Sequence, residues 1–396
     1  MKQNVKIFAK TIEDAAYEQV SKLSECEAYK NCEIRVMPDV HAGKGCTIGT
    51  VVALGKRVIP NTVGVDIGCG MKVTHLGKEK PNLEKLDRII NEKVPSGFNI
   101  HNEALSFVKD EGLNILSKIR CLDDSYIDMA LRSIGSLGGG NHFIEIDVDD
   151  NGSYYLVIHT GSRNLGVRVC NYYQELAYQQ CNKNKCDISV IIDKLKREGR
   201  EREIESAIKA VKTSTVPKEL SYLDGELADN YLNDMYYTQL YAHLNRCAIA
   251  HVICENIGYV GNSCIRSFTT IHNYIEMATG ILRKGAISAK TGEHVIIPMN
   301  MRDGSLICVG KGNKDWLYSA PHGAGRIMSR SQAKKELSIE KYKTEMNGIY
   351  SSSVCEETID EAPMAYKPME EIIQLIQPTV DVVNIIKPVY NFKAKS

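Results

Sequence analysis

The chain has 396 residues, with an apolar fraction of 43% and 49 basic side chains that balance 49 acidic ones. This composition predicts an ordinary globular core, and the charge balance argues against a protein that holds nucleic acid through an overall basic surface. No apolar run is long enough for a membrane span, and the N-terminus lacks the apolar core of a signal peptide. Thirteen cysteines without framework spacing then favour reduced thiols and a cytoplasmic protein.

The N-terminal stretch predicts a short strand followed by a helix over Thr11–Glu27. A second strand is expected to end at Pro38, before a loop that carries Asp39, His41 and Lys44 among three glycines. This loop does not fit the phosphate-binding P-loop, because no Gly-Lys-Ser/Thr follows at the required spacing. A turn with a solvated Asp and Lys is an equally good interpretation of these residues.

A glycine-rich turn follows within Val63-Gly-Val-Asp-Ile-Gly-Cys-Gly-Met71, where Asp66 and Cys69 lie three residues apart. A strand would point these two side chains to opposite faces, so the spacing predicts a tight turn after a short apolar run. The carboxylate and the thiol could each ligate a metal ion, and a thiolate can bridge two ions. Residues 78–132 then show charged, helical patterning and predict peripheral helices.

Two polar clusters come next, each beside a predicted strand. A glycine triplet precedes Asn141 and His142, and the apolar residues after them predict a strand. The apolar run Tyr154–His159 predicts another strand that ends in a polar loop. The end of a strand is a common place for functional side chains, because the strand fixes them and the loop exposes them.

The second half of the chain predicts a charged helical region over Val169–Lys212 and a long helix from about Gly225 to about Asn256. Further strands are expected at Lys284–Ser288, Val295–Pro298 and Ser305–Val309, with Met299–Ser305 as a loop. No repeat, low-complexity segment or clear linker divides the chain, so one interleaved domain is the simpler prediction.

Five side chains in these turns suit a metal site: Asp66, Cys69, His142, His159 and His272. One carboxylate, one thiol and three imidazoles favour manganese, iron, cobalt or zinc over magnesium or calcium. Five ligands are too many for one tetrahedral zinc, and they suit two ions with open positions that clamp phosphoryl oxygens. A single histidine is more often a packed or surface residue, but three of the ten histidines lie in glycine- or asparagine-flanked turns.

His322 has a different setting, because Pro321, Gly323 and Gly325 expose it and Arg326 and Arg330 supply positive charge nearby. An imidazole fixed beside arginines could be a metal ligand, a general base or a nucleophile that forms a phosphoramidate. The spacing does not select among these roles.

Several long motifs resemble the signature segments of the RtcB family of RNA ligases. They are Val63–Met71, Gly138–Glu145, His159–Asn164 and His322–Arg330, together with Met37–Gly45 and Pro363–Lys367. The similarity runs in the family's order from about residue 30 to the C-terminal tail, and it resembles a shorter bacterial branch. It implies an α+β fold of the RtcB type, with residues 1–396 as a single large mixed domain. In that fold, strands carry glycine-rich loops around a central metal and nucleotide cleft, with helices on the periphery.

The resemblance implies a ligase that uses GTP and two manganese ions to join RNA ends in RNA repair or tRNA splicing. One end would carry a 3'-phosphate or 2',3'-cyclic phosphate and the other a 5'-hydroxyl. By position, His322 would take up GMP and pass it to the RNA 3'-phosphate, before the 5'-hydroxyl attacks and expels GMP. The implied metal ligands are the five residues above, with Cys69 bridging. RNA and GTP would be the partners, with an archease-like protein as a candidate activator and no membrane.

The resemblance also assigns nucleotide contacts to Asn141, Glu145, Asn300, Ser305, His322, Gly323, Gly325, Tyr366 and Lys393, and an RNA phosphate contact to Arg163. A carboxylate such as Glu145 can accept from the N1–H and exocyclic amine of guanine, which adenine cannot offer. One loop departs from the family: Pro298-Met-Asn-Met-Arg302 stands in place of the usual Pro-Gly-Ser-Met-Gly. Asn300 therefore replaces a serine, and Arg302 adds a charge. A second departure is Thr270-Ile-His272 in place of His-His, with the second histidine retained.

Two other classes of protein are alternatives. A dinuclear metallophosphoesterase could hydrolyse cyclic phosphate ends without joining them, but it would have no use for a guanine pocket or a nucleophilic His322. A non-catalytic RNA-binding module is disfavoured by the neutral charge balance and by the lack of interleaved aromatic and basic motifs.

Overall fold

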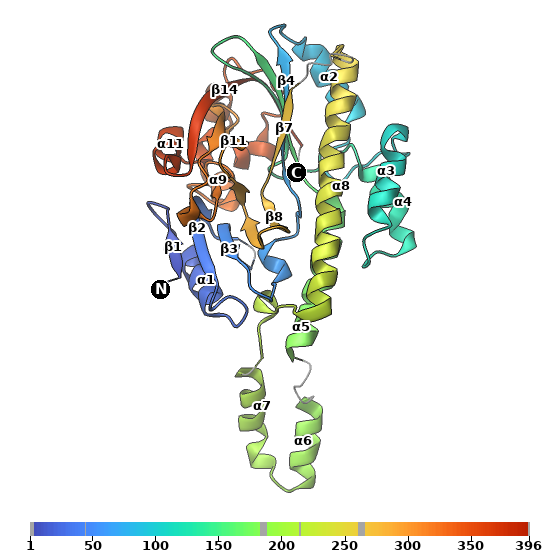
Figure 1. Ribbon diagram of the computed structural model, residues 1–396, viewed down its shortest axis with the longest axis vertical. Coiled ribbons are helices and arrows are strands. Elements are labelled where there is room, and N and C mark those ends of the chain that lie inside the picture. The colour runs from blue at the N-terminus through green and yellow to red at the C-terminus, as the bar shows by residue number, and fades with distance from the viewer. Residues whose placement is uncertain (1–3, 44, 183–187, 214, 260–265, 395–396) are drawn as a thin grey trace.

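The computed structural model describes residues 4–43, 45–182, 188–213, 215–259 and 266–394. Two large sheets form the body, a long helix α8 (Gly225–Ile257) runs along one side, and a helical hairpin of α6 (Ile188–Arg197) and α7 (Ile204–Thr213) projects from one end (Figure 1). The mixture of sheets and helices confirms the predicted α+β class. In the described part of the chain, every helix is too short or too polar to cross a membrane.

The larger sheet has seven antiparallel strands in the order β11-β12-β14-β5-β6-β4-β7. Its strands are β4 (Gly70–Gly77), β5 (Phe143–Val148), β6 (Tyr154–Thr160), β7 (Ser267–Ile271), β11 (His294–Asn300), β12 (Gly304–Gly310) and β14 (Val380–Lys393). The two edge strands, β11 and β7, approach each other: the Ile296 amide of β11 donates to the Thr270 hydroxyl of β7 at 3.2 Å. The sheet is therefore nearly closed.

Apolar side chains cover both faces of this sheet, as expected for strands buried on two sides. One apolar cluster is shared by all seven strands and so lies on the inner face: Met71, Val73, Phe143, Val157, Phe268, Ile296, Ile307 and Ile386. The outer face of β5 and β6 packs against α2 (Leu83–Lys93) and α8. Helix α11 (Met369–Ile376) covers β11 and β12.

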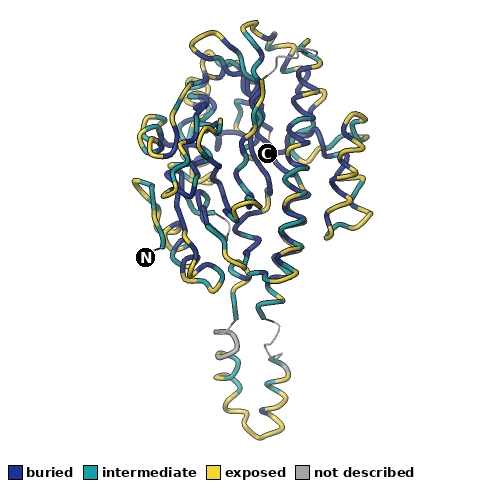
Figure 2. The backbone as a smooth tube through the Cα atoms, viewed as in Figure 1, coloured by how far each residue is buried: buried dark blue, intermediate teal, exposed yellow. Residues whose placement is uncertain are grey.

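A five-stranded sheet lies beside the first, in the order β1-β2-β3-β9-β8. Its strands are β1 (Val5–Ile7), β2 (Glu33–His41), β3 (Ile48–Ala53), β9 (Ile281–Lys284) and β8 (Asn273–Glu276). A short pair, β10 (Ala286–Ser288) and β13 (Ser319–Pro321), completes the strands of the described ranges. Figure 2 shows that buried residues follow these strands through the body, whereas the α6–α7 hairpin is largely exposed.

The helices agree well with the sequence predictions. Helix α1 (Asp14–Glu25) follows β1, and the peripheral helices are α2, α3 (Lys109–Leu116) and α4 (Asp124–Ser133). The charged region contains α5 (Arg163–Asn182), α6 and α7, and the long helix is α8. Two short helices near the C-terminus are α9 (Arg330–Glu336) and α10 (Ile339–Glu345).

Two strand predictions were wrong, and one long strand was missed. Strand β2 continues past Pro38 to His41, because an irregular register between Val36 and His41 accommodates the proline. The predicted strand Lys284–Ser288 is divided at Gly285, whose φ of 57° turns the chain. Strand β14 was not predicted at all, although it lies between β12 and β5. Lys44, which the sequence placed in a loop, lies outside the described residues.

Candidate functional site

The candidate metal ligands gather at one rim of the seven-stranded sheet. Because neighbouring strands are antiparallel, this rim collects the starts of β4, β5 and β12 and the ends of β6, β7, β11 and β14. Gly70 of β4 pairs with Thr160 of β6 and Ile271 of β7, and Phe143 of β5 pairs with His159 of β6 and Lys393 of β14. The register alone therefore brings together turns from the whole length of the chain.

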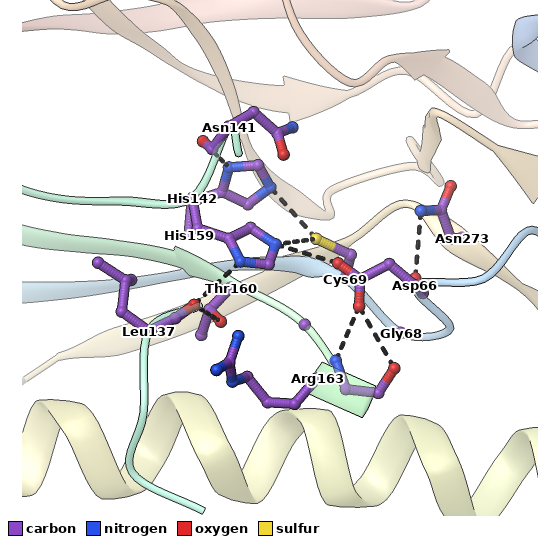
Figure 3. Close-up of polar contacts among 12 residues, drawn as sticks. Asp66, Gly68, Cys69, Leu137, Asn141, His142, His159, Thr160, Arg163 and Asn273 are labelled. Atoms are coloured by element: carbon purple, nitrogen blue, oxygen red, sulfur yellow. Dashed lines mark hydrogen bonds and ion pairs between the residues drawn. The ribbon is translucent and has the colours of Figure 1, made fainter. Parts of the chain in front are cut away.

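The Cys69 sulfur lies at the centre of the cluster. It is 3.5 Å from Nε2 of His142 and 3.4 Å from Nε2 of His159. Nε2 of His142 is 3.0 Å from Oδ2 of Asp66, and Nε2 of His159 is 3.1 Å from Nε2 of His272. The ligand atoms form two groups that share the sulfur, one with Asp66 and His142 and one with His159 and His272. Figure 3 shows the Cys69 sulfur in contact with His142 and His159.

The hydrogen bonds of the Nδ1 atoms of His142 and His159 show that the cluster suits a cation. Nδ1 of His142 lies 2.9 Å from the Leu137 carbonyl, and Nδ1 of His159 lies 3.2 Å from the Asn141 carbonyl. A carbonyl can only accept, so both Nδ1 atoms carry the proton and both Nε2 lone pairs face the sulfur. Buried lone pairs that converge in this way cost free energy unless a positive ion lies among them.

The pKa directions agree with this reading of the cluster. Burial lowers the pKa of His159 and His272 well below the usual value, so both imidazoles are neutral and able to ligate. Burial opposes the charge of Asp66, but the neighbouring His142 side chain and the hydrogen bond from the Ser162 amide hold the pKa of its carboxyl below the usual range. Burial and the nearby Asp66 raise the pKa of the Cys69 thiol, so a bound cation is what would favour the thiolate.

Two glycines leave room for functional side chains. A Cβ atom on Gly161 would overlap the Asp66 carboxylate. A Cβ atom on Gly138 would overlap the Arg163 guanidinium and lie 2.9 Å from Nδ1 of His142, and its φ of 83° also favours glycine. Close packing against the candidate ligands thus explains why glycine occupies these two positions of the motifs.

His322 lies in the loop after β13 and faces the cluster, with its ring centroid 4.6 Å from that of His272. Its Nδ1 lies 2.6 Å from Oδ2 of Asp39, and its backbone amide donates to the same oxygen at 3.1 Å. The interpretation of Asp39 as a solvated turn residue was wrong, because Asp39 is fully buried. Since the carboxylate accepts the Nδ1 proton, Nε2 is the ring nitrogen that carries the lone pair.

One cavity beside the cluster collects most of the remaining predicted residues. Its lining includes Asn141, Glu145, Asn300, His322, Gly323, Gly325, Tyr366 and Lys393, together with His159 and His272. Ser305 does not line it, but its buried hydroxyl makes no hydrogen bond within the described ranges. Arg163 lies in a neighbouring groove that shares Lys393 with the cavity.

A family model described as tRNA-splicing ligase RtcB matches residues 19–394 of the chain. The RNA-splicing ligase RtcB of Escherichia coli K12 is 31% identical, in an alignment that covers 90% of this chain and 88% of the relative. The tRNA-splicing ligase RtcB of Aeropyrum pernix is 28% identical over 86% and 83% of the two chains, and that of Archaeoglobus fulgidus is 25% identical over 92% and 88%. The chain belongs to the RtcB family.

The loop that departs from the usual RtcB pattern is stabilised from within. The Asn300 side-chain oxygen accepts from the amides of Arg302 at 3.0 Å and Asp303 at 2.9 Å, and its Nδ2 donates to Asp303 at 2.7 Å. The Arg302 guanidinium pairs with Asp303 and Glu345. Asn300 and Arg302 thus hold the β11–β12 turn together.

Sequence reasoning missed two buried residues of α8 that hold the site of this RtcB chain together. Asn245 accepts from the amides of Gly135 and Ser136, and it donates to the carbonyls of Ser136 and Gly161 at 3.1 Å each. Arg246 donates to the carbonyls of Gly68 at 2.8 Å and Thr160 at 2.9 Å. A polar pair on the buried face of a long helix is the signal that could have found them.

Glu361 was also missed, and it organises the wall of the cavity. It forms ion pairs with Lys393 and Arg330 at 2.8 Å each, and it accepts from the Tyr366 hydroxyl at 2.7 Å. These contacts outweigh the effect of burial and lower the pKa of Glu361. Glu145 lies on the same wall, where burial raises the pKa of its carboxyl to about 7.

Proposed function

We propose that this RtcB chain is a GTP- and manganese-dependent RNA ligase. It would join a 3'-phosphate or 2',3'-cyclic phosphate end to a 5'-hydroxyl end in RNA repair or tRNA splicing in the cytoplasm, with an archease-like protein as a candidate activator. Family membership and the names of the relatives support this activity. The observation that carries it is the position of His322, oriented by Asp39 beside two ligand groups that share Cys69.

His322 is the proposed nucleophile. Asp39 holds the proton on Nδ1, so the Nε2 lone pair is free to attack the α-phosphorus of GTP. The Nε2–phosphorus bond forms as the bond to pyrophosphate breaks, and the buried carboxylate balances the positive charge that the ring acquires. GMP then passes to the RNA 3'-phosphate, which frees His322. The 5'-hydroxyl attacks that activated phosphate and expels GMP, and a cyclic phosphate would first be opened by water.

Two manganese ions are the proposed cofactors. Asp66, Cys69 and His142 would hold one ion, and Cys69, His159 and His272 the other, with the thiolate bridging. The bound ions would supply Lewis acidity that neutralises charge on the phosphoryl oxygens. The carbonyls of Leu137 and Asn141 keep His142 and His159 in the tautomer that can ligate.

The cavity next to His322 is the proposed guanylate site. Glu145 would accept from the guanine N1–H and amine, with Lys393, Tyr366 and Ser305 near the base or ribose. Asn141, Asn300, Gly323 and Gly325 would lie along the rest of the nucleotide, and Arg163 would contact an RNA phosphate. The buried Ser305 hydroxyl has no hydrogen-bond partner in the described part of the chain, and this supports the proposal because a buried hydroxyl is normally paired.

The direct test is ligation of two defined RNA strands, one with a 3'-phosphate and one with a 5'-hydroxyl, with GTP and each divalent metal in turn. We expect a joined product with manganese and GTP, none with ATP in place of GTP, and none from His322→Ala. His294→Ala is the matched control, since His294 is exposed at the far end of β11. Opening of cyclic phosphate ends without any joined product would refute the ligase and favour a phosphoesterase.

A further inference from the structure

A groove next to the proposed guanylate cavity carries a fully exposed aromatic ring. Phe98 has the highest relative exposure of the large apolar side chains in the described ranges, at 105%, and Met129 beside it is 43% exposed. The groove is also lined by Gly139, Gly140, Arg163 and Lys393. Lys393 lines the guanylate cavity too, so the groove adjoins the proposed reaction centre.

The turn that carries Phe98 is fixed to the metal-site loop. The Gly97 amide donates to the Gly138 carbonyl at 2.9 Å, and the Leu137 amide donates to the Pro95 carbonyl at 2.8 Å. The Gly97 carbonyl in turn accepts from Nη2 of Arg163 at 2.8 Å. The turn of Phe98 is therefore held in place by hydrogen bonds to the glycine-rich loop that leads to His142.

Arg163 places a positive charge beside this ring. Its Nε donates to the Ser136 hydroxyl at 3.0 Å and its Nη2 to Gly97, while its Nη1 makes no hydrogen bond to the described part of the chain. The backbone of Arg163 adopts a φ of 57°, which is uncommon for a residue other than glycine. A cation and an exposed ring on adjoining backbone match the phosphate and the base of a single-stranded nucleotide.

We propose that Phe98 is a stacking platform for the terminal base of an RNA end, while Arg163 takes the phosphate of that end. This inference rests on the proposed ligase function and adds a residue that positions the substrate. A single exposed apolar side chain is ordinary on a protein surface. Phe98 differs because its turn is hydrogen-bonded to the metal-site loop and because its groove shares Lys393 with the proposed guanylate cavity. Stacking accepts any base, so the platform would strengthen binding without selecting a sequence.

The test uses RNA with a 3'-phosphate or a 5'-hydroxyl and 2-aminopurine as the terminal base, whose fluorescence falls on stacking. We expect quenching by the wild-type protein with at least one of the two ends, loss of it in Phe98→Ala, and recovery in Phe98→Trp. Phe98→Leu keeps an apolar side chain without a ring and should not restore it. The KM for RNA should rise about tenfold in Phe98→Ala. Phe107→Ala is the matched control, because Phe107 is 48% exposed and lies outside the groove.

Guanylylation by labelled GTP in the absence of RNA separates the two proposals. All Phe98 variants should be labelled like the wild type, because Phe98 does not line the guanylate cavity. Wild-type labelling and ligation with unchanged quenching and KM in Phe98→Ala would overturn the stacking platform alone. Quenching that depends on the ring in a protein that GTP does not label would keep the platform and overturn the ligase.

Discussion

The contact between Asp39 and His322 gives the sharpest prediction for the proposed mechanism. Substitution Asp39→Asn keeps the size of the side chain and one oxygen that can accept from both the His322 amide and Nδ1. The opposite orientation would set the Asn amide against two donors, so the oxygen must face His322. The new NH2 group then takes the place of Oδ1, which is buried and makes no hydrogen bond to the residues that the structure describes. The variant therefore preserves the tautomer of His322 and removes only the negative charge.

The magnitude follows from the two hydrogen bonds. A hydrogen bond to a charged group contributes about 1.5–3 kcal/mol and a neutral one about 0.5–1.5 kcal/mol. The hydrogen bond from the His322 backbone amide is the same before and during the reaction. The hydrogen bond from Nδ1 strengthens as the ring becomes positive, so only this hydrogen bond changes the barrier. The loss should be about 1–2 kcal/mol, which corresponds to about 5- to 30-fold in rate.

The assay is the single-turnover rate of GMP transfer from labelled GTP to the protein, with manganese saturating. We expect the rate to fall by the factor above in Asp39→Asn, with the KM for GTP unchanged. Asp381→Asn serves as control, since Asp381 is exposed in β14. A loss of less than about twofold would refute the role of Asp39 in orienting and charging His322.

Three further predictions concern the metal cluster and the guanine pocket. Cys69→Ala removes the ligand that both groups share. Ligation and bound manganese should therefore be lost, while the circular dichroism spectrum is retained. Ligation at the wild-type level would mean that the bridging role is wrong. Gly161→Ala pushes the Asp66 carboxylate aside and should weaken metal binding about 10- to 100-fold in a titration. Gly55→Ala is the control, because Gly55 has open space around it and the substitution should not change metal binding. Equal metal affinities of the two variants would contradict the packing argument. Glu145, with a pKa raised to about 7 by burial, is protonated below that pH and ionised above it, and only the ionised form accepts fully from guanine. GTP affinity measured by calorimetry should therefore rise from about pH 6 to about pH 8 in the wild type and stay flat in Glu145→Gln; parallel profiles would exclude Glu145 as the guanine acceptor.

The candidate ligands could be predicted because their signal is local. Asp66, Cys69 and His142 each stand in a glycine-rich turn beside a short strand, and the chemistry of the donors suggests a transition ion without any knowledge of the fold. The pairing of these turns into two groups that share Cys69 could not be worked out from spacing, since it depends on the register of four antiparallel strands.

The supporting residues were missed because their roles come from distant contacts. Asp39 and His322 are 283 positions apart, and nothing near Asp39 in the sequence marks it as buried. Arg246 lies in a helix whose periodicity predicts packing, yet its guanidinium bonds to carbonyls of two other segments. Strand β14 was missed because Pro388 and several polar residues obscure its alternation, and a register shift beside Pro388 accommodates the proline.

The organisation of residues 1–396 as one domain stays a prediction, and the strand order favours it. Strand β14 comes from the C-terminal end of the chain but lies between β12 and β5, and β9 returns to pair with β3 near the N-terminus. The contact between His322 and Asp39 joins the loop after β13 to β2 of the five-stranded sheet. A division of the chain between β3 and β9, or between β5 and β14, would therefore separate paired strands.

The most direct measurement of the central claim is to locate the GMP that labelled GTP leaves on the protein. Peptide mapping by mass spectrometry, under alkaline conditions that preserve a phosphoramidate, should find one GMP on the peptide that contains His322. The label should be lost in acid and absent from His322→Ala, while His294→Ala is labelled like the wild type. A protein that ligates RNA without any such label, or that carries GMP on another residue, would contradict the account.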